Sequence, residues 1–262
     1  MGDQIKAIQA AKSSSRDRTI FHEILESDTS DAEKSTPRLI DEAMVLTIAG
    51  TDTTASTLSA LTFHILNDQS IFDRLRAELE GAMPDLHQPL DPVTLSSLPF
   101  MNALIEEALR LYPSATHRQD RVAPSDDLIF TYPDGKQIVI PAGTIVGMNA
   151  PLLNRHPDWY SDPDEFRPER YLDDPRLLRR HLTFSKGGRQ CLGINLAYQE
   201  LQMFTAGIFR KYRVFDKTAQ HQHGPTLELV ETTIEDVRMY ADFVTPGLRP
   251  GSIGVQVKVR QG

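Results

Sequence analysis

Cysteine is almost absent from this sequence, which holds only Cys191 among 262 residues. A single cysteine excludes an internal disulfide and a multi-cysteine zinc site, so Cys191 is either a buried small hydrophobe or a reactive ligand or nucleophile. Positive charge is also in deficit: 28 Lys and Arg stand against 36 Asp and Glu, which argues against a nucleic-acid partner. The sequence has no apolar run long enough for a membrane span and no signal-peptide pattern at its start.

The composition is otherwise typical of a globular protein, with 40% hydrophobic and 24% charged residues. These fractions exclude a disordered chain, a collagen and a coiled coil. The length predicts one large domain or two small ones, and the sequence shows no internal repeat and no clear domain boundary.

Hydrophobic spacing predicts a mainly α protein with small β-sheets, an α+β fold class. The longest helix is expected to begin at Thr36-Pro37, where a hydroxyl N-cap precedes a proline at the first helical position, and to end near Asn67. Alternating apolar residues predict a hairpin over 128–140 and a further strand over 145–148. The other predicted helices cover 70–82, 100–112 and 192–209, and residues 154–189 are expected to form a long irregular segment.

The long helix contains an unusual run, Ala49-Gly50-Thr51-Asp52-Thr53-Thr54. Glycine inside a helix costs about 1 kcal/mol relative to alanine, so a break of local rules here indicates a site. Gly50 would allow a close approach to the backbone, and Asp52 beside Thr53 could relay protons. The structural alternative is that the threonine hydroxyls bond to carbonyls of the preceding turn while Asp52 has a buried partner.

Glu107 and Arg110 lie three residues apart, on one face of the helix predicted over 100–112. Such a pair is usually exposed, but the apolar residues around it and the proline stop at Pro113 favour burial. A buried ion pair needs further hydrogen bonds to tolerate desolvation. The segment Phe166–Tyr171 could supply another guanidinium.

Cys191 follows a glycine-rich turn, directly precedes a predicted helix and stands two residues after Arg189. Helix N-terminal amides and a nearby cation favour the thiolate form of a cysteine. A cysteine hydrolase would need a histidine base, but His156 and His181 lie in the irregular segment and are expected at the surface. A zinc site would need a histidine pair at ligand spacing, which is lacking. The remaining use of a lone thiolate is one axial bond to haem iron.

These three segments, in this order, resemble the cytochrome P450 superfamily of haem-thiolate monooxygenases. The haem-binding signature is matched at each fixed position, by Phe184, Gly187, Arg189, Cys191 and Gly193. Residues 49–54 match the oxygen-activation motif, and Glu107-x-x-Arg110 with 166–171 matches the structural triad of Glu107, Arg110 and Arg170, apart from Tyr171 where Phe is usual. The tail, residues 231–255, further resembles fungal members that are similar to trichodiene oxygenase.

The resemblance implies haem b as the cofactor, with Cys191 as its thiolate ligand. It implies that Arg189 and Arg121 contact the haem propionates, and that Asp52 and Thr53 deliver protons during dioxygen activation. Ala49 and Gly50 would flank the distal face of the haem. The fold implied is the C-terminal portion of the family fold, so that residues 1–262 form a single partial domain without the N-terminal half, and apolar faces of the long helix are expected to be exposed.

The resemblance also implies partners: a small hydrophobic substrate, and NADPH–cytochrome P450 reductase as the source of electrons. Lys186, Arg179 and Arg180 could belong to the reductase-docking surface, or could simply be solvated charges. The full-length family member is expected at the endoplasmic reticulum membrane, whereas this chain contains no anchor and its own location stays open.

Three functions follow as hypotheses. The first is a monooxygenase that inserts one oxygen atom of dioxygen into a small hydrophobic molecule, in fungal secondary metabolism. The second is a truncated, non-catalytic remnant or interaction chain. The third is a haem-thiolate isomerase or dehydratase acting on a hydroperoxide without outside electrons, against which the pair Asp52-Thr53 argues, because such enzymes need no proton delivery to dioxygen.

Overall fold

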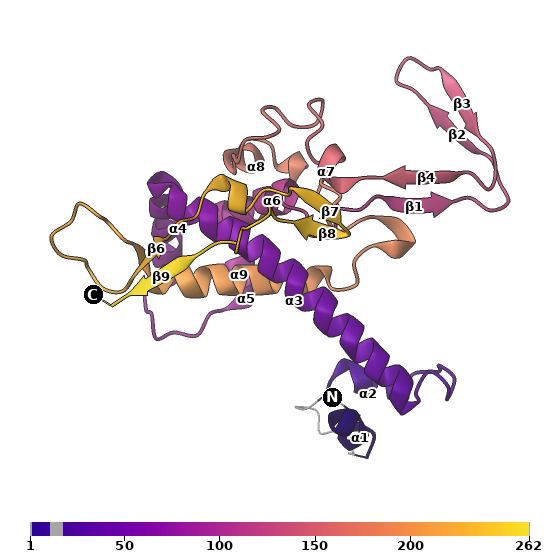
Figure 1. The fold of residues 1–262 in the computed structure, drawn as a ribbon, viewed down its shortest axis with the longest axis horizontal. Helices are drawn as coiled ribbons and strands as arrows, with labels where there is room; N and C mark the ends of the chain where they lie inside the picture. Colours follow the sequence, from indigo (N-terminus) through magenta and orange to yellow (C-terminus); the bar gives the residue numbers. More distant parts are fainter. Residues whose placement is uncertain (1, 11–17, 262) are drawn as a thin grey trace. The chain divides into compact units, whose positions relative to one another are not determined.

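The structure is a computed structural model that describes residues 2–10 and 18–261. The chain divides into two compact units, Met1–Asp52 and Thr53–Gly262, and each is described by itself. The helices in Figure 1 are α1 (Gly2–Ala10), α2 (Ile20–Glu26), α3 (Thr36–Asn67), α4 (Gln69–Ala82), α5 (Pro92–Ser96), α6 (Pro99–Leu111), α7 (Ala150–Leu153), α8 (Glu169–Asp173) and α9 (Ile194–Lys211). The strands are β1 (Gln119–Val122), β2 (Leu128–Thr131), β3 (Gln137–Ile140), β4 (Ile145–Met148), β5 (Arg213–Val214), β6 (Thr226–Leu229), β7 (Ala241–Phe243), β8 (Thr245–Gly247) and β9 (Val257–Arg260).

The predicted long helix is confirmed as α3. It runs without interruption through residues 49–54, called the glycine–threonine motif below. Its predicted N-cap is wrong by one residue. The Leu39 amide donates to the Ser35 carbonyl at 3.0 Å, so Ser35 is the cap, while the Thr36 hydroxyl donates to Gln9 Oε1 at 2.8 Å. A shift of one residue at a helix end is small because terminal turns fray.

The first unit has a small core of its own. Ile5 of α1 and Leu39 and Ala43 of α3 are buried there, with side chains of α2 packed around them. Farther along α3, Met44 and Ile48 are 49% and 59% exposed. The expectation of exposed apolar faces on this helix is therefore confirmed.

The core of the second unit surrounds α6. Nearly every side chain of α6 is buried, and the helix contributes Met101, Leu104, Ile105 and Ala108 to a cluster shared with α4 and α9. The Glu78 carboxylate of α4 accepts the amides of Phe100 and Met101 at 2.8 Å each, which satisfies free N–H groups at the start of α6. A helix that is buried on all sides can carry charged residues only if each has partners.

The strands of the described residues form four small sheets, which confirms the predicted mixture of helices with small sheets. The predicted hairpin is confirmed as the antiparallel pair β2–β3, and the predicted strand over 145–148 is β4. Sequence patterning missed the partner of β4, which is β1; Figure 1 shows the two strands side by side. Residues of β1 are exposed or half-buried and carry no clear alternation. The remaining sheets are β5-β6-β9 and β7-β8.

Candidate functional site

The segment 184–193 forms a closed loop that presents Cys191. The Cys191 amide donates to the Phe184 carbonyl at 2.9 Å, which joins the two ends of the turn. Ser185 and Gly187 have φ angles of 58° and 74°, in the left-handed region, which explains the glycine at 187 but leaves Ser185 in an unfavourable conformation. Cys191 is exposed, and α9 begins three residues later at Ile194.

Two exposed arginines belong to this surface. Arg121 of β1 donates from its guanidinium to the Ser185 hydroxyl at 3.2 Å, so the structure brings β1 against the Cys191 loop. Arg189 lies within the loop, and its guanidinium has no hydrogen bond or ion pair with any described residue. Lys186, Arg179 and Arg180 are exposed as well.

A buried ion network is centred on Glu107, which is fully buried and joins two arginines. Arg110 donates from Nε and Nη2 to the Glu107 carboxylate, both at 2.8 Å, and Arg170 donates from Nε at 3.1 Å. Side-chain exposure is 0% for Glu107 and Arg110 and 2% for Arg170. Burial alone lowers the pKa of Arg110, but the hydrogen bonds and charge of Glu107 outweigh it and leave that pKa raised.

Arg110 and Arg170 also organise the segment predicted to be irregular. Arg110 donates to the carbonyls of Asn154, Pro163 and Glu165 at 2.9, 2.6 and 3.1 Å. Arg170 donates to the Ser161 carbonyl at 2.6 Å. The segment between α7 and α8 is therefore ordered by buried guanidinium groups, which substitute for the hydrogen bonds of regular secondary structure.

The glycine–threonine motif lies at the junction of the two units. Ala49, Gly50 and Asp52 belong to the first unit, and a side chain added at Gly50 would meet nothing within 4 Å. In the second unit, the Thr53 carbonyl accepts from the Ser114 hydroxyl at 2.9 Å and from Thr57 at 3.2 Å.

Within residues 49–54, the structural alternative does not hold for Thr54, whose hydroxyl donates to Glu200 of α9 at 3.2 Å and not to a carbonyl of the preceding turn. Thr57, one turn later, does make such a bond, to the Thr53 carbonyl. The second half of α3 is thereby tied to the segment after α6 and to the helix that follows Cys191.

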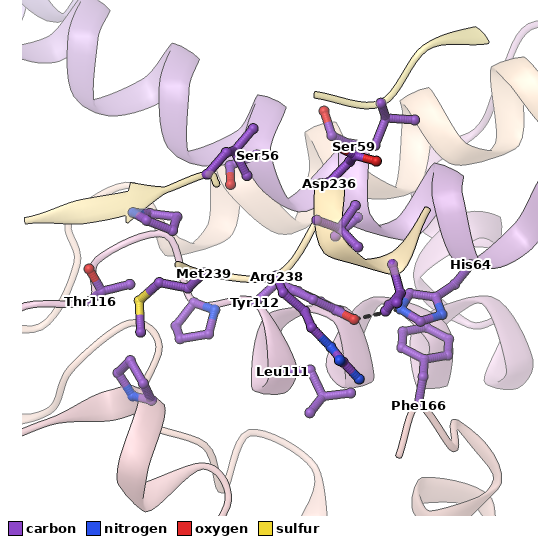
Figure 2. Close-up of a pocket in the computed structure, with 18 of the residues that line it drawn as sticks. Ser56, Ser59, His64, Leu111, Tyr112, Thr116, Phe166, Asp236, Arg238 and Met239 are labelled. Carbon is purple, nitrogen blue, oxygen red and sulfur yellow. Dashed lines mark hydrogen bonds between the residues drawn. The ribbon is translucent and has the colours of Figure 1, made fainter. Parts of the chain in front are cut away.

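A pocket of about 930 Å³ opens next to the hydrogen bond between Ser114 and Thr53. It is lined by Ser56 on α3 and by Pro113 and Thr116, on either side of Ser114. Its wall is largely apolar, with Leu111, Pro151, Val237, Met239 and Leu248. Figure 2 shows Tyr112 and His64 meeting on one side of the pocket, where the Tyr112 hydroxyl and His64 Nε2 are 2.7 Å apart.

His64 is held in the neutral form. Its ring stacks on Phe166 with centroids 3.8 Å apart, and burial, with the charge of Arg238 second, lowers its pKa to about 4. Burial raises the pKa of Tyr112 to about 12, so the phenol stays protonated at neutral pH and shares a hydrogen bond with His64 Nε2. The pocket is also lined by four charged residues, Arg155, Asp164, Asp236 and Arg238. Each of them makes an ion pair: Arg155 with Asp164 at 3.2 Å, Asp236 with Arg249, and Arg238 with Glu235.

Among known protein families, the sequence model described as Cytochrome P450 matches residues 3–233 of this chain.

The chain belongs to the cytochrome P450 family.

Curated P450 relatives are similar over nearly all of the chain. Cytochrome P450 monooxygenase tpcC of Cochliobolus heterostrophus is 42% identical over 243 residues, which are 92% of this chain and 46% of that protein. Fusicoccadiene C-8 hydroxylase of Phomopsis amygdali is 40% identical over 244 residues, 92% of this chain and 44% of that protein. The chain therefore spans about half the length of the curated relatives it matches.

Solved P450 structures show the same fold. The chain superposes on the retinoic-acid-bound cyanobacterial CYP120A1 with a TM-score of 0.75 at 24% identity, and on CYP102L1 with 0.73 at 19%. Each match covers 100% of this chain and 54% of the solved one. The mainly α architecture with small sheets is accordingly that of the P450 fold.

The P450 family implies haem, and the residues of the Cys191 loop fit it. The donor is one exposed sulfur on a loop whose ends are joined, which suits a single axial bond. A side chain added at Gly187 or Gly188 would meet nothing within 4 Å, so this part of the loop leaves room for a flat group. No group of three or more His, Cys, Asp or Glu able to hold a metal occurs among residues 2–10 and 18–261.

Nothing in the structure of this chain requires glycine at position 193 of the signature. A side chain added there would lie 4.0 Å from the Cys191 sulfur, an ordinary van der Waals distance. Its φ of −86° is open to any residue.

Sequence reasoning missed a second buried cluster next to this loop. His181, expected at the surface, is 4% exposed, and its Nε2 lies 3.2 Å from Oε2 of the buried Glu106. His156, the other histidine of the segment, is exposed as expected. Glu106 stands beside Glu107 in an apolar helix, and two adjacent acidic residues there were the available signal.

Proposed function

We propose that this chain carries the haem-binding and oxygen-activating portion of a cytochrome P450 monooxygenase. The substrate class is a small hydrophobic molecule of fungal secondary metabolism, into which one oxygen atom of dioxygen is inserted. Bound haem supplies the iron at which dioxygen is activated, with electrons drawn from NADPH through a reductase.

The observation that carries this proposal is Cys191 itself. It is the one cysteine of the sequence, it is exposed, and its amide is pinned to the Phe184 carbonyl. A buried structural cysteine would have no need of such a loop. Arg121 and Arg189 supply two guanidinium groups on the same loop surface, which suits the two carboxylates of haem b.

Asp52 and Thr53 are proposed to move the protons. A hydroxyl beside a carboxylate can pass a proton inward while the carboxylate exchanges it with solvent, and Asp52 is exposed. The Ser114 hydroxyl fixes the Thr53 carbonyl at 2.9 Å, which holds this turn of α3 in place.

The pocket beside Ser114 is proposed to take part of the substrate. Its apolar wall and its uncharged Tyr112–His64 pair favour a neutral, hydrophobic molecule over an ion. The relatives support a hydroxylation while leaving the substrate open, because they are named after different ones: fusicoccadiene in two relatives and N-acetyltryptophan in another.

The exposed cations Lys186, Arg179 and Arg180 are proposed as part of the reductase-docking surface. Such a surface would attract the acidic side of a partner and act mainly on the association rate. In the described part of the chain, no helix is both long and apolar enough to cross a bilayer. For the full-length family member, an endoplasmic reticulum membrane location is proposed from the family resemblance.

The test is a reduced carbon-monoxide difference spectrum of the chain expressed with haem, beside Cys191→Ser as the matched control. A strongly red-shifted Soret band in the wild type alone is the expected result, since thiolate ligation causes it. Failure to take up haem, or the same spectrum in both proteins, would instead support the non-catalytic alternative.

A further inference from the structure

A buried polar cluster behind the Cys191 loop has no part in the function described so far. Glu106 of α6 is 4% exposed and accepts two hydrogen bonds, from the Tyr198 hydroxyl at 2.7 Å and from the Arg179 amide at 2.9 Å. His181 Nε2 lies 3.2 Å from the same carboxylate, within ion-pair distance although not aligned as a hydrogen bond. Burial acts to raise the pKa of Glu106, but these three partners together keep it below its ordinary value.

The cluster reaches the loop through one side chain. The Phe184 ring lies 5.4 Å from the Tyr198 ring and 6.2 Å from the His181 ring, measured between centroids. Phe184 is also the residue whose carbonyl accepts the Cys191 amide at 2.9 Å. Phe184 therefore links the two: its ring contacts the cluster, and its carbonyl holds the Cys191 backbone.

The backbone leading into the loop is held in an uncommon conformation by the same carboxylate. Arg179 has a φ of 55°, in the left-handed region that a residue with a Cβ rarely adopts. Its amide is the one that donates to Glu106, and its guanidinium lies 4.8 Å from the centre of the Tyr198 ring. Strained backbone persists where the surroundings fix it, and here Glu106 and Tyr198 do so.

A second set of bonds anchors the middle of the segment to α6. The Thr183 hydroxyl donates to the Leu109 carbonyl at 2.6 Å, and the Leu182 amide donates to Asn154 Oδ1 at 2.8 Å. These bonds fix residues 182 and 183, whereas the Glu106 cluster contacts the segment at residues 179, 181 and 184. The cluster and the network around Arg110 therefore hold different residues of the segment.

We propose that Glu106, His181 and Tyr198 are positioning residues that fix Phe184 and, through it, the loop that presents the Cys191 sulfur. This role rests on the proposed haem ligation by Cys191. None of the three touches the reacting atoms; they act by keeping the loop in a single conformation.

The first experiment measures backbone order in the apo-protein, which does not depend on haem. Amide hydrogen exchange is followed in peptides covering 179–193 for the wild type, Tyr198→Phe, Glu106→Gln and Tyr112→Phe. Tyr112→Phe is the matched control, because it also removes one phenol hydroxyl with a 2.7 Å hydrogen bond, to His64. We expect exchange in 179–193 to rise about tenfold in the two cluster variants, with α4 unchanged, and to stay at the wild-type rate in the control.

The second experiment reports on ligation in the haem-loaded protein, at a temperature where every variant is folded. We expect the fraction of the reduced carbon-monoxide complex with the red-shifted Soret band to fall at least about twofold in Tyr198→Phe and Glu106→Gln. A merely structural cluster would lower the unfolding temperature without moving this fraction.

The two experiments separate the two proposals. A wild type without the red-shifted band refutes the proposed function, whereas exchange in 179–193 still tests the cluster. Unchanged exchange in both cluster variants, or an equal rise in Tyr112→Phe, overturns the positioning role even if the wild-type spectrum is as expected. Faster exchange spread evenly over the whole chain overturns it too, since the loss would then be global.

Discussion

Replacing Glu107 by alanine tests whether the buried ion network holds the second unit together. The carboxylate accepts two bonds from Arg110, one from Arg170 and one from the Arg167 amide at 2.8 Å. Its removal leaves the guanidinium groups of Arg110 and Arg170 buried without a counter-charge. Their remaining partners are backbone carbonyls, which carry no net charge.

Magnitudes for such a change are large. Breaking a buried ion pair by deleting one partner costs about 3–5 kcal/mol, because the other charge stays desolvated. In a domain of this size, 1 kcal/mol corresponds to a shift in unfolding midpoint of about 2–4 °C, so Glu107→Ala is expected to lower the midpoint by about 6–20 °C. Glu107→Gln retains the shape and one acceptor but loses the charge, and its midpoint should fall between those of Glu107→Ala and the wild type.

Circular dichroism during thermal unfolding measures this shift, with Glu169→Ala as the matched control. Glu169 makes a single ion pair with Arg74 at 3.0 Å, and the two side chains are 42% and 49% exposed. An exposed pair contributes about 0–1 kcal/mol, so the control should unfold within a few degrees of the wild type. Equal shifts in Glu107→Ala and Glu169→Ala would refute the reasoning that burial makes the Glu107 network costly to break.

Two further predictions concern the pocket and the loop. The pKa of His64 is lowered from 6.5 to about 4 in the folded protein, so between these pH values the unfolded state binds a proton that the folded state does not. The free energy of unfolding should therefore fall as the pH drops from about 6.5 towards 4, by about 3 kcal/mol at most. His64→Phe should lose less stability over this range than the wild type in urea unfolding, and a pH response equal to that of the wild type would contradict this. Gly187→Ala should lower the free energy of unfolding by about 1–2 kcal/mol, because the φ of Gly187 is 74°. Gly188 has no such angle and has open space around it, so Gly188→Ala should lower it by less than about 0.5 kcal/mol. Equal losses in the two variants would show that the angle is not the cause.

Local patterns were sufficient for the elements that depend on nearby residues. The hairpin β2–β3 follows from alternation around a turn with Gly135 at a φ of 84°, and α3 follows from its cap, its proline and its apolar spacing. The partner of β4 could not be found in this way, because the pairing with β1 joins strands that are distant in sequence and is set by where the chain returns. Residues 154–189 lacked periodicity for a related reason: besides their own short turns, their order depends on Arg110 of α6, which binds the Asn154 carbonyl, and on Arg170, which binds the Ser161 carbonyl.

The sequence by itself determined the fold class, the family resemblance and the identity of the thiolate candidate, because a spaced signature around one cysteine is a property of the chain. The sequence also grouped Glu107 with Arg110 and Arg170, which lie together in the structure. Only the tertiary structure decided the second buried cluster: it moved His181 from an expected surface position to 4% exposure and set Phe184 beside His181 and Tyr198. Burial is a property of what packs around a side chain, and the packing partners of these residues come from α6, α9 and the segment between them, which no local pattern brings together.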